Sequence, residues 1–174
     1  MKNILVAIDG SASSNKVVSE AVKLASDAGA AVTFLNVIER GHINKPYHEM
    51  AELELSGRVA DPTAVQPLLG ISPEMNAIGA MQARETHSLA VAQLVSDRVL
   101  DEAVRIAAQA GLNSVKKVSA YGDAASEIVK TAGSMQADLV VVGRRGMSEL
   151  VELFLGSVSQ KVLHRTAASV LVVS

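Results

Sequence analysis

The sequence contains no cysteine and no tryptophan among its 174 residues. The missing thiols exclude disulfide bonds, zinc–thiolate sites and thiol nucleophiles. Aromatic residues make up only 2% of the chain, although hydrophobic residues make up 49%. Alanine, valine, leucine and isoleucine must therefore fill the core, and this composition favours helices packed closely against a sheet.

The chain also lacks a strong charge of either sign and a long apolar run. Its net charge is −2 and no cluster of lysine and arginine stands out, which argues against a nucleic-acid partner. No apolar stretch reaches the roughly 18 residues of a membrane span. The start, "MKNILVAIDG", has neither the apolar length nor the cleavage site of a signal peptide. We therefore expect a cytoplasmic, soluble protein, with one domain over residues 1–174 and no membrane insertion.

Short apolar runs alternate with longer amphipathic segments along the chain. Runs typical of buried strands occupy residues 3–8, 31–38, 115–120, 137–142 and 169–173. Helical periodicity marks residues 13–29, 92–110, 123–135 and 157–166, with Ser13 or Ser14 as the first cap and Gly29 and Gly111 as helix ends. This alternation predicts an α/β fold, an open parallel sheet with helices on both faces.

Residues 40–74 interrupt the alternation. They hold all four prolines and two of the four histidines. A structureless loop of this length is uncommon inside a compact domain, and "YHEMAELELSG" (47–57) could supply a short helix. We expect an irregular, partly ordered insertion; the sequence leaves open whether it forms a lid, an interface or a mobile segment.

A glycine-rich stretch, "GRRGMSELVELFLGS" (143–157), follows the fourth predicted strand in the spacing G-x2-G-x9-G-S. Ligands of open parallel sheets bind at the carboxyl ends of strands, where the direction of the connections reverses. If the first strand is central, its end at "DGS" (9–11) faces the end of the fourth strand at "GRRG" (143–146). We expect the site between these two ends.

The residue types at these ends suit a phosphate group. Glycines let backbone N–H groups approach an anion without obstruction by a Cβ atom. Gly156 and Ser157 begin the last predicted helix, whose free N–H groups and dipole favour a phosphate. Ser157 could cap that helix or donate to the phosphate, Arg144 and Arg145 could neutralise it, and Asp9 could accept from ribose hydroxyls. The structural alternative, in which each glycine only ends a strand or turns a loop, is weakened by the placement of all three opposite Asp9.

Other chemistries lack their motifs. There is no G-x4-G-K-[ST] and no G-x-G-x-x-G after the first strand, so neither a P-loop nor a Rossmann dinucleotide site is expected. The four histidines are scattered, which gives no metal site. "GSVSQ" is not a nucleophile elbow, and we expect no catalytic residues.

Four segments, "ILVAIDGSASS", "FLNVIE", "VVGRRG…LGS" and "SVLVV", together resemble the universal stress protein family. The resemblance covers nearly the whole chain except about residues 40–85. The G-x2-G-x9-G-[ST] spacing is typical of the family's ATP-binding branch. The resemblance implies the strand order 3-2-1-4-5 of an adenine nucleotide alpha hydrolase-like fold. It also implies homodimers formed through the last strand, by Val170, Leu171, Val172 and Val173.

The ligand implied by this resemblance is ATP, with Mg²⁺ held through the phosphates near Asp9. Ala7 and Val37 would line the adenine pocket, Val37 largely through its backbone. The full nucleotide-binding set is Ala7, Ile8, Asp9, Val37, Val142, Gly143, Arg144, Arg145, Gly146, Gly156, Ser157, Val158 and Ser159. One departure is Ser169, where many relatives carry proline before the final strand.

The function implied is that of a nucleotide-dependent regulatory protein in the stress response, with a further regulatory protein partner. Two alternatives remain. The first is a slow ATPase or self-phosphorylating enzyme using the same pocket; the loop has no lysine and no evident base to organise γ-phosphate transfer, which argues against it. The second is an interaction module that binds another adenine nucleotide or none.

Overall fold

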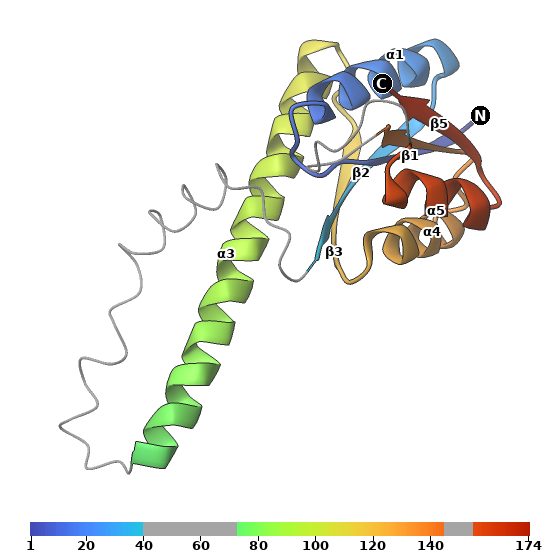
Figure 1. Cartoon of the computed structure of the whole chain (residues 1–174). Helices are drawn as coiled ribbons and strands as arrows, with labels where there is room; N and C mark the ends of the chain where they lie inside the picture. The colour runs from blue at the N-terminus through green and yellow to red at the C-terminus, as the bar shows by residue number, and fades with distance from the viewer. Residues whose placement is uncertain (40–72, 145–154) are drawn as a thin grey trace.

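The computed structural model describes residues 1–39, 73–144 and 155–174, with side chains of helix α3 described from Leu89 onward. The elements in chain order are β1 (Asn3–Ala7), α1 (Ser14–Ala28), β2 (Ala31–Ile38), α3 (Pro73–Gln109), β3 (Val115–Tyr121), α4 (Ala124–Ser134), β4 (Leu139–Gly143), α5 (Ser157–Arg165) and β5 (Ser169–Val173) (Figure 1). All five strands run parallel in the order β3-β2-β1-β4-β5. The predicted α/β fold and strand order are confirmed. No helix in the described part of the chain is long and apolar enough to cross a membrane.

The two faces of the sheet carry separate apolar cores. Alternate strand residues such as Ile4, Val6 and Phe34 pack under α1 and α3, and the residues between them, such as Leu5 and Leu35, pack under α4 and α5. All five of these side chains are fully buried. This two-sided burial is why the strands read as continuous apolar runs instead of alternating ones.

Helix α3 begins far earlier than the periodicity predicts. The expected helix spans residues 92–110, but α3 runs from Pro73 to Gln109, 37 residues, so Pro73 and Glu74 of the expected insertion are helical. Figure 1 shows the C-terminal part of α3 lying against the sheet and the N-terminal part extending beyond it. Apolar residues at helical spacing in the sequence mark the part of α3 that packs against the sheet. A proline in the first turn suits the observed start. The remaining insertion, residues 40–72, and the short helix expected at 47–57 lie outside the described residues.

Helix ends follow the sequence signals in part. Gly29 ends α1 in the left-handed conformation, with φ of 61°, as expected of a C-terminal glycine. Ser13 occupies the position before α1 without a capping side-chain bond. Of the two roles considered for Ser157, capping of α5 is excluded, because Gly156 is the capping residue and Ser157 is the first helical one. The α5 cap therefore carries no side chain.

Asp138 joins the amino ends of three strands. Its carboxylate accepts from the backbone N–H groups of Lys2 and Asn3. Its own N–H donates to the Asn3 carbonyl, and its carbonyl accepts from Ser169 N–H at 3.2 Å. The N–H donors of Lys2 and, next, Asn3 hold the pKa of Asp138 below the usual aspartate value.

This lowered pKa predicts a pH dependence of stability. The unfolded chain binds the proton of Asp138 more readily, so the contribution of Asp138 is complete above the unfolded pKa of about 4 and is lost as the pH falls through the lower folded pKa. Asp138→Asn removes this titration and should flatten the acid-side fall of the unfolding free energy, measured by urea denaturation at a series of pH values. Ser26→Ala, at an exposed position of α1, removes no titrating group and should keep the wild-type slope. Equal slopes in Asp138→Asn and the wild type would contradict the assignment.

Candidate functional site

The central strand β1 ends before its neighbour β2 does. Ala7, the last residue of β1, lies opposite Leu35, whereas β2 continues to Ile38. One further backbone bond, from Ile8 N to the Leu35 carbonyl at 2.9 Å, closes the pairing of these two strands. Beyond this point the edge of β2 that faced β1 is left open.

Asn36 takes the place of the next backbone bond. Its side-chain Nδ2 donates to the Ile8 carbonyl at 2.8 Å. If β1 and β2 stayed paired one residue further, this carbonyl would instead accept from Val37 N–H. Among the described residues no backbone bond joins Val37 to Ile8. Asn36 is only 7% exposed, so its amide is fixed within the structure. The Val37 backbone groups on this side are consequently available to a ligand.

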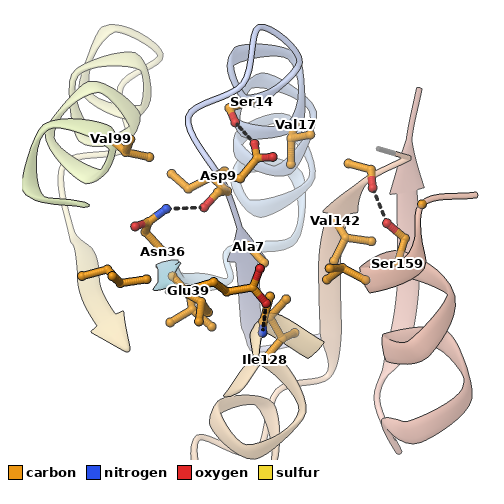
Figure 2. A pocket seen from close by; sticks show the side chains of 18 of the residues that line it. Ala7, Asp9, Ser14, Val17, Asn36, Glu39, Val99, Ile128, Val142 and Ser159 are labelled. Atoms are coloured by element: carbon orange, nitrogen blue, oxygen red, sulfur yellow. Dashed lines mark hydrogen bonds between the residues drawn. The ribbon is translucent and has the colours of Figure 1, made fainter. Parts of the chain in front are cut away.

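Asp9 lies where the chain leaves β1. Its Oδ1 accepts from Ser11 N–H and from the hydroxyl of Ser14, each at 3.0 Å. Gly10, with φ of 75°, has the left-handed conformation that this turn into α1 requires. Figure 2 shows Asp9 held against the start of α1 through Ser14. One carboxylate oxygen is thus committed to the turn, and within the described residues the other has no recorded partner.

A second carboxylate, Glu39, lies just past the end of β2. Its Oε1 accepts from the N–H of Ala124, the first residue of α4, at 2.7 Å. That N–H is one of the four that a helix start leaves without a partner inside the helix. Glu39 therefore ties the end of β2 to the start of α4 (Figure 2), and it lines the same cavity as Ala7.

The opposite wall is the junction of β4, α5 and β5. The hydroxyl of Ser159, a buried residue, donates to the Gly143 carbonyl at 2.6 Å. Arg144 is held through its backbone: its carbonyl accepts from Gly156 N–H at 2.8 Å, and its N–H donates to the Val173 carbonyl. These bonds fix the start of α5 beside the carboxyl end of β4.

A cavity of about 250 Å³ lies between these walls. It opens at the carboxyl ends of β1, β2 and β4, where the sequence places the site. Of the predicted residues, those that line the cavity are Ala7, Ile8, Asp9, Val37, Val142, Gly143, Gly156, Ser157, Val158 and Ser159. Arg144 is not among the lining residues, and Arg145 and Gly146 lie outside the described residues.

Several lining residues are absent from the sequence-based set. Asn36, Glu39, Ser14 and Ile128 belong to the wall, as do Val95 and other residues of α3. Glu39 follows a strand end just as Asp9 does, so the same rule could have found it. No sequence signal marks Asn36, because its role depends on a carbonyl supplied by another strand. Within residues 1–39, 89–144 and 155–174, side chains form no cluster suited to a metal ion.

The parallel sheet and its cavity define the class of the protein: a doubly wound α/β protein with a ligand-sized cavity at the reversal of its strand order. A sequence model of the universal stress protein family matches residues 1–174. The chain belongs to this family.

Individual relatives agree with this membership. The universal stress protein YxiE of Bacillus subtilis (strain 168) is 31% identical over 170 residues, which cover 98% of this chain and 97% of the relative. A solved universal stress protein in complex with cAMP has a TM-score of 0.59 at 22% identity, covering 99% of this chain and 95% of that chain. The universal stress protein from Archaeoglobus fulgidus in complex with dAMP has a TM-score of 0.54 at 16% identity, covering 100% and 98%. At these identities the two structures establish a shared fold.

The bond from Asn36 predicts a stability cost on its removal. Asn36→Ala leaves the Ile8 carbonyl without its donor in a buried position, which should lower the unfolding free energy by about 1–3 kcal/mol. Denaturant unfolding measures this loss. Ser19→Ala is a matched control, since its hydroxyl donates to the Asn15 carbonyl on an exposed turn of α1, and it should cost less than about 0.5 kcal/mol. A cost for Asn36→Ala no larger than that of Ser19→Ala would argue against the role given to Asn36.

Proposed function

We propose that the cavity binds an adenine nucleotide, ATP, and that its occupancy regulates the interactions of a homodimer. The observation that carries the proposal is the pairing of an open backbone edge at Val37 with the start of α5 across one cavity. The two solved relatives hold cAMP and dAMP, which supports an adenine nucleotide as the class of ligand.

The base would occupy the end of the cavity formed by β2 and α4. Val37 offers there a backbone N–H donor and a carbonyl acceptor that are not bonded to Ile8. The Watson–Crick edge of adenine presents the complementary pair, the N1 acceptor and the N6 amino donor. Ala7, Ile128 and Val142 supply apolar surface on either side, as is usual in small-molecule sites.

The phosphates would lie at the start of α5. The first N–H groups of a helix have no partner within it and carry partial positive charge. Gly156 has an extended backbone, with φ of −62° and ψ of 153°, and Gly143 is a strand residue. Neither conformation requires glycine, so the absence of a Cβ atom at these two positions is better explained by a ligand that approaches the backbone closely.

Asp9 would meet the ribose or the phosphate region. Its Oδ1 is held by Ser11 and Ser14, which leaves the other oxygen to accept from a ribose hydroxyl or from water around a Mg²⁺ ion carried by the phosphates. Arg145 and Gly146 are proposed to complete the phosphate site on the basis of sequence alone. Regulation of a protein partner by the nucleotide is likewise part of the proposal.

Substitutions of Gly156 distinguish a role in ligand binding from a role in the stability of the fold. Aspartate and asparagine are both favoured capping residues. In nucleotide-free buffer, the unfolding free energies of Gly156→Asp and Gly156→Asn should therefore each lie within about 1 kcal/mol of the wild-type value. Gly156→Asp places a carboxylate at the proposed phosphate position and should weaken ATP binding by at least about 100-fold, measured by calorimetry. Gly156→Asn keeps the size without the charge and should weaken binding less. Wild-type protein that binds none of ATP, ADP, AMP and cyclic AMP would refute the proposal.

The homodimer is proposed to form through β5, the last strand in the sheet order. Val170, Leu171 and Val172 are only half-buried, and Val173 is buried. Ser169 N–H donates to Asp138 and the Val173 carbonyl accepts from Arg144. The backbone groups of Val170 and Val172, which alternate with these, therefore face the open edge. An apolar edge strand of this kind favours cover by a second chain.

Proline on this edge tests the interface. Val172→Pro removes an outward N–H while leaving the bonds to β4 in place, a substitution that edge strands tolerate. We expect Val172→Pro to sediment as a monomer under conditions where the wild type is a dimer. Lys117→Pro, on the opposite edge strand β3, is the matched control and should stay dimeric. If Val172→Pro remains a folded dimer, the interface lies elsewhere.

A further inference from the structure

Glu39 places a fixed carboxylate at the base end of the cavity. Glu39 and Val37 are two residues apart on the same extended segment, so their side chains point to the same face of the sheet, the face covered by α4 and α5. The bond from Ala124 N–H to Oε1, at 2.7 Å, fixes the orientation of the carboxylate. Figure 2 shows the carboxylate bonded at the start of α4, on the wall of the cavity that Ala7 also lines.

The second oxygen of Glu39 is free to meet a ligand. Across the described residues, the bond to Ala124 is the single hydrogen bond recorded for this side chain. Glu39 lines the cavity, and an ionised carboxylate can only accept hydrogen bonds. This oxygen is therefore an acceptor in the part of the cavity that Val37 also borders.

The position of Glu39 also suits its charge. The start of α4 carries partial positive charge, which stabilises a carboxylate bonded to its first N–H group. The proposed phosphate position is at the start of a different helix, α5, on the far side of Val142 (Figure 2). Glu39 is thus placed to attract a donor on the base without lying at the phosphates.

We propose that Glu39 is a specificity-determining residue that accepts a hydrogen bond from the exocyclic amino group of the base. The proposal rests on the proposed function, because it assumes a nucleotide whose base lies against Val37. An exocyclic amino group has two hydrogens. One can be donated to the Val37 carbonyl, and the other to the free oxygen of Glu39. The site thereby selects 6-aminopurines over purines without that group.

The substitution Glu39→Gln tests this assignment, because the bond from Ala124 N–H determines which side-chain atom at position 39 faces the ligand. The N–H of Ala124 still requires an acceptor, so the glutamine oxygen takes the place of Oε1 and the amide NH₂ takes the place of the free oxygen. An acceptor becomes a donor, which cannot bond an amino group. The protein should remain folded, because the bond to the start of α4 is kept.

Two ligands isolate the contact: ATP and purine riboside triphosphate, which carries hydrogen in place of the 6-amino group and keeps the N1 acceptor for Val37. The ratio of their two Kd values measures what the amino group contributes. We expect this ratio to favour ATP in the wild type and to fall by about tenfold or more in Glu39→Gln, the loss of roughly one charge-assisted hydrogen bond. Calorimetry with each purified full-length protein gives both constants.

Control variants keep the outcomes separate. Glu127→Gln removes a carboxylate from α4 that pairs with Lys130 at 3.2 Å and does not line the cavity, so it should retain the wild-type ratio. Glu39→Asp keeps the charge but shortens its reach, and should lower the ratio as Glu39→Gln does. Tight ATP binding with a ratio unchanged in both Glu39 variants would overturn the assignment of Glu39 alone. Absence of ATP binding by the wild type would instead overturn the proposed function on which it rests.

Discussion

The cavity of this protein depends on one constraint: the central strand β1 stops at Ala7 while β2 continues to Ile38. A parallel strand satisfies its backbone groups only where a neighbour lies beside it. Past Leu35, β2 has lost that neighbour, and the Asn36 side chain bonds the carbonyl of Ile8, the residue that follows β1. Because β2 extends further than β1, a short stretch of its backbone has no strand beside it. Helices cover both faces of the sheet around this stretch, and the cavity makes it accessible to a small molecule.

The charged side chains of this cavity are held by the turn into α1 and by the start of α4. Asp9 is bonded to the turn into α1, and Glu39 to the start of α4. In each of these two cavity-lining carboxylates, one oxygen is bonded to the protein, which fixes the orientation of the group. The start of α5 has no side chain at its cap, because Gly156 is the capping residue. Anionic side chains therefore mark two parts of the cavity, and bare helical N–H groups mark a third.

Sequence reasoning predicts the architecture well, because strand burial and helix periodicity both leave direct traces in the order of residues. It also places Asp9 and Gly156 at the cavity, because Asp9 follows a strand end and Gly156 precedes a helix start, two positions where ligands bind. It cannot identify Asn36, whose partner is a carbonyl 28 positions away in sequence. It underestimates α3 because amphipathic spacing reports only packing against the sheet, and the N-terminal part of this helix runs past the sheet. It leaves open whether Ser157 caps α5, because capping propensity cannot distinguish two adjacent residues that both suit a helix start.

Arg144 connects the cavity to the edge strand through its peptide groups alone. Its carbonyl holds the cap of α5, and its N–H holds the end of β5. Main-chain bonds of this kind do not depend on which side chain a residue carries, apart from proline, which lacks the N–H group. A substitution of Arg144 by any residue except proline therefore keeps both the donor and the acceptor that join α5 to β5.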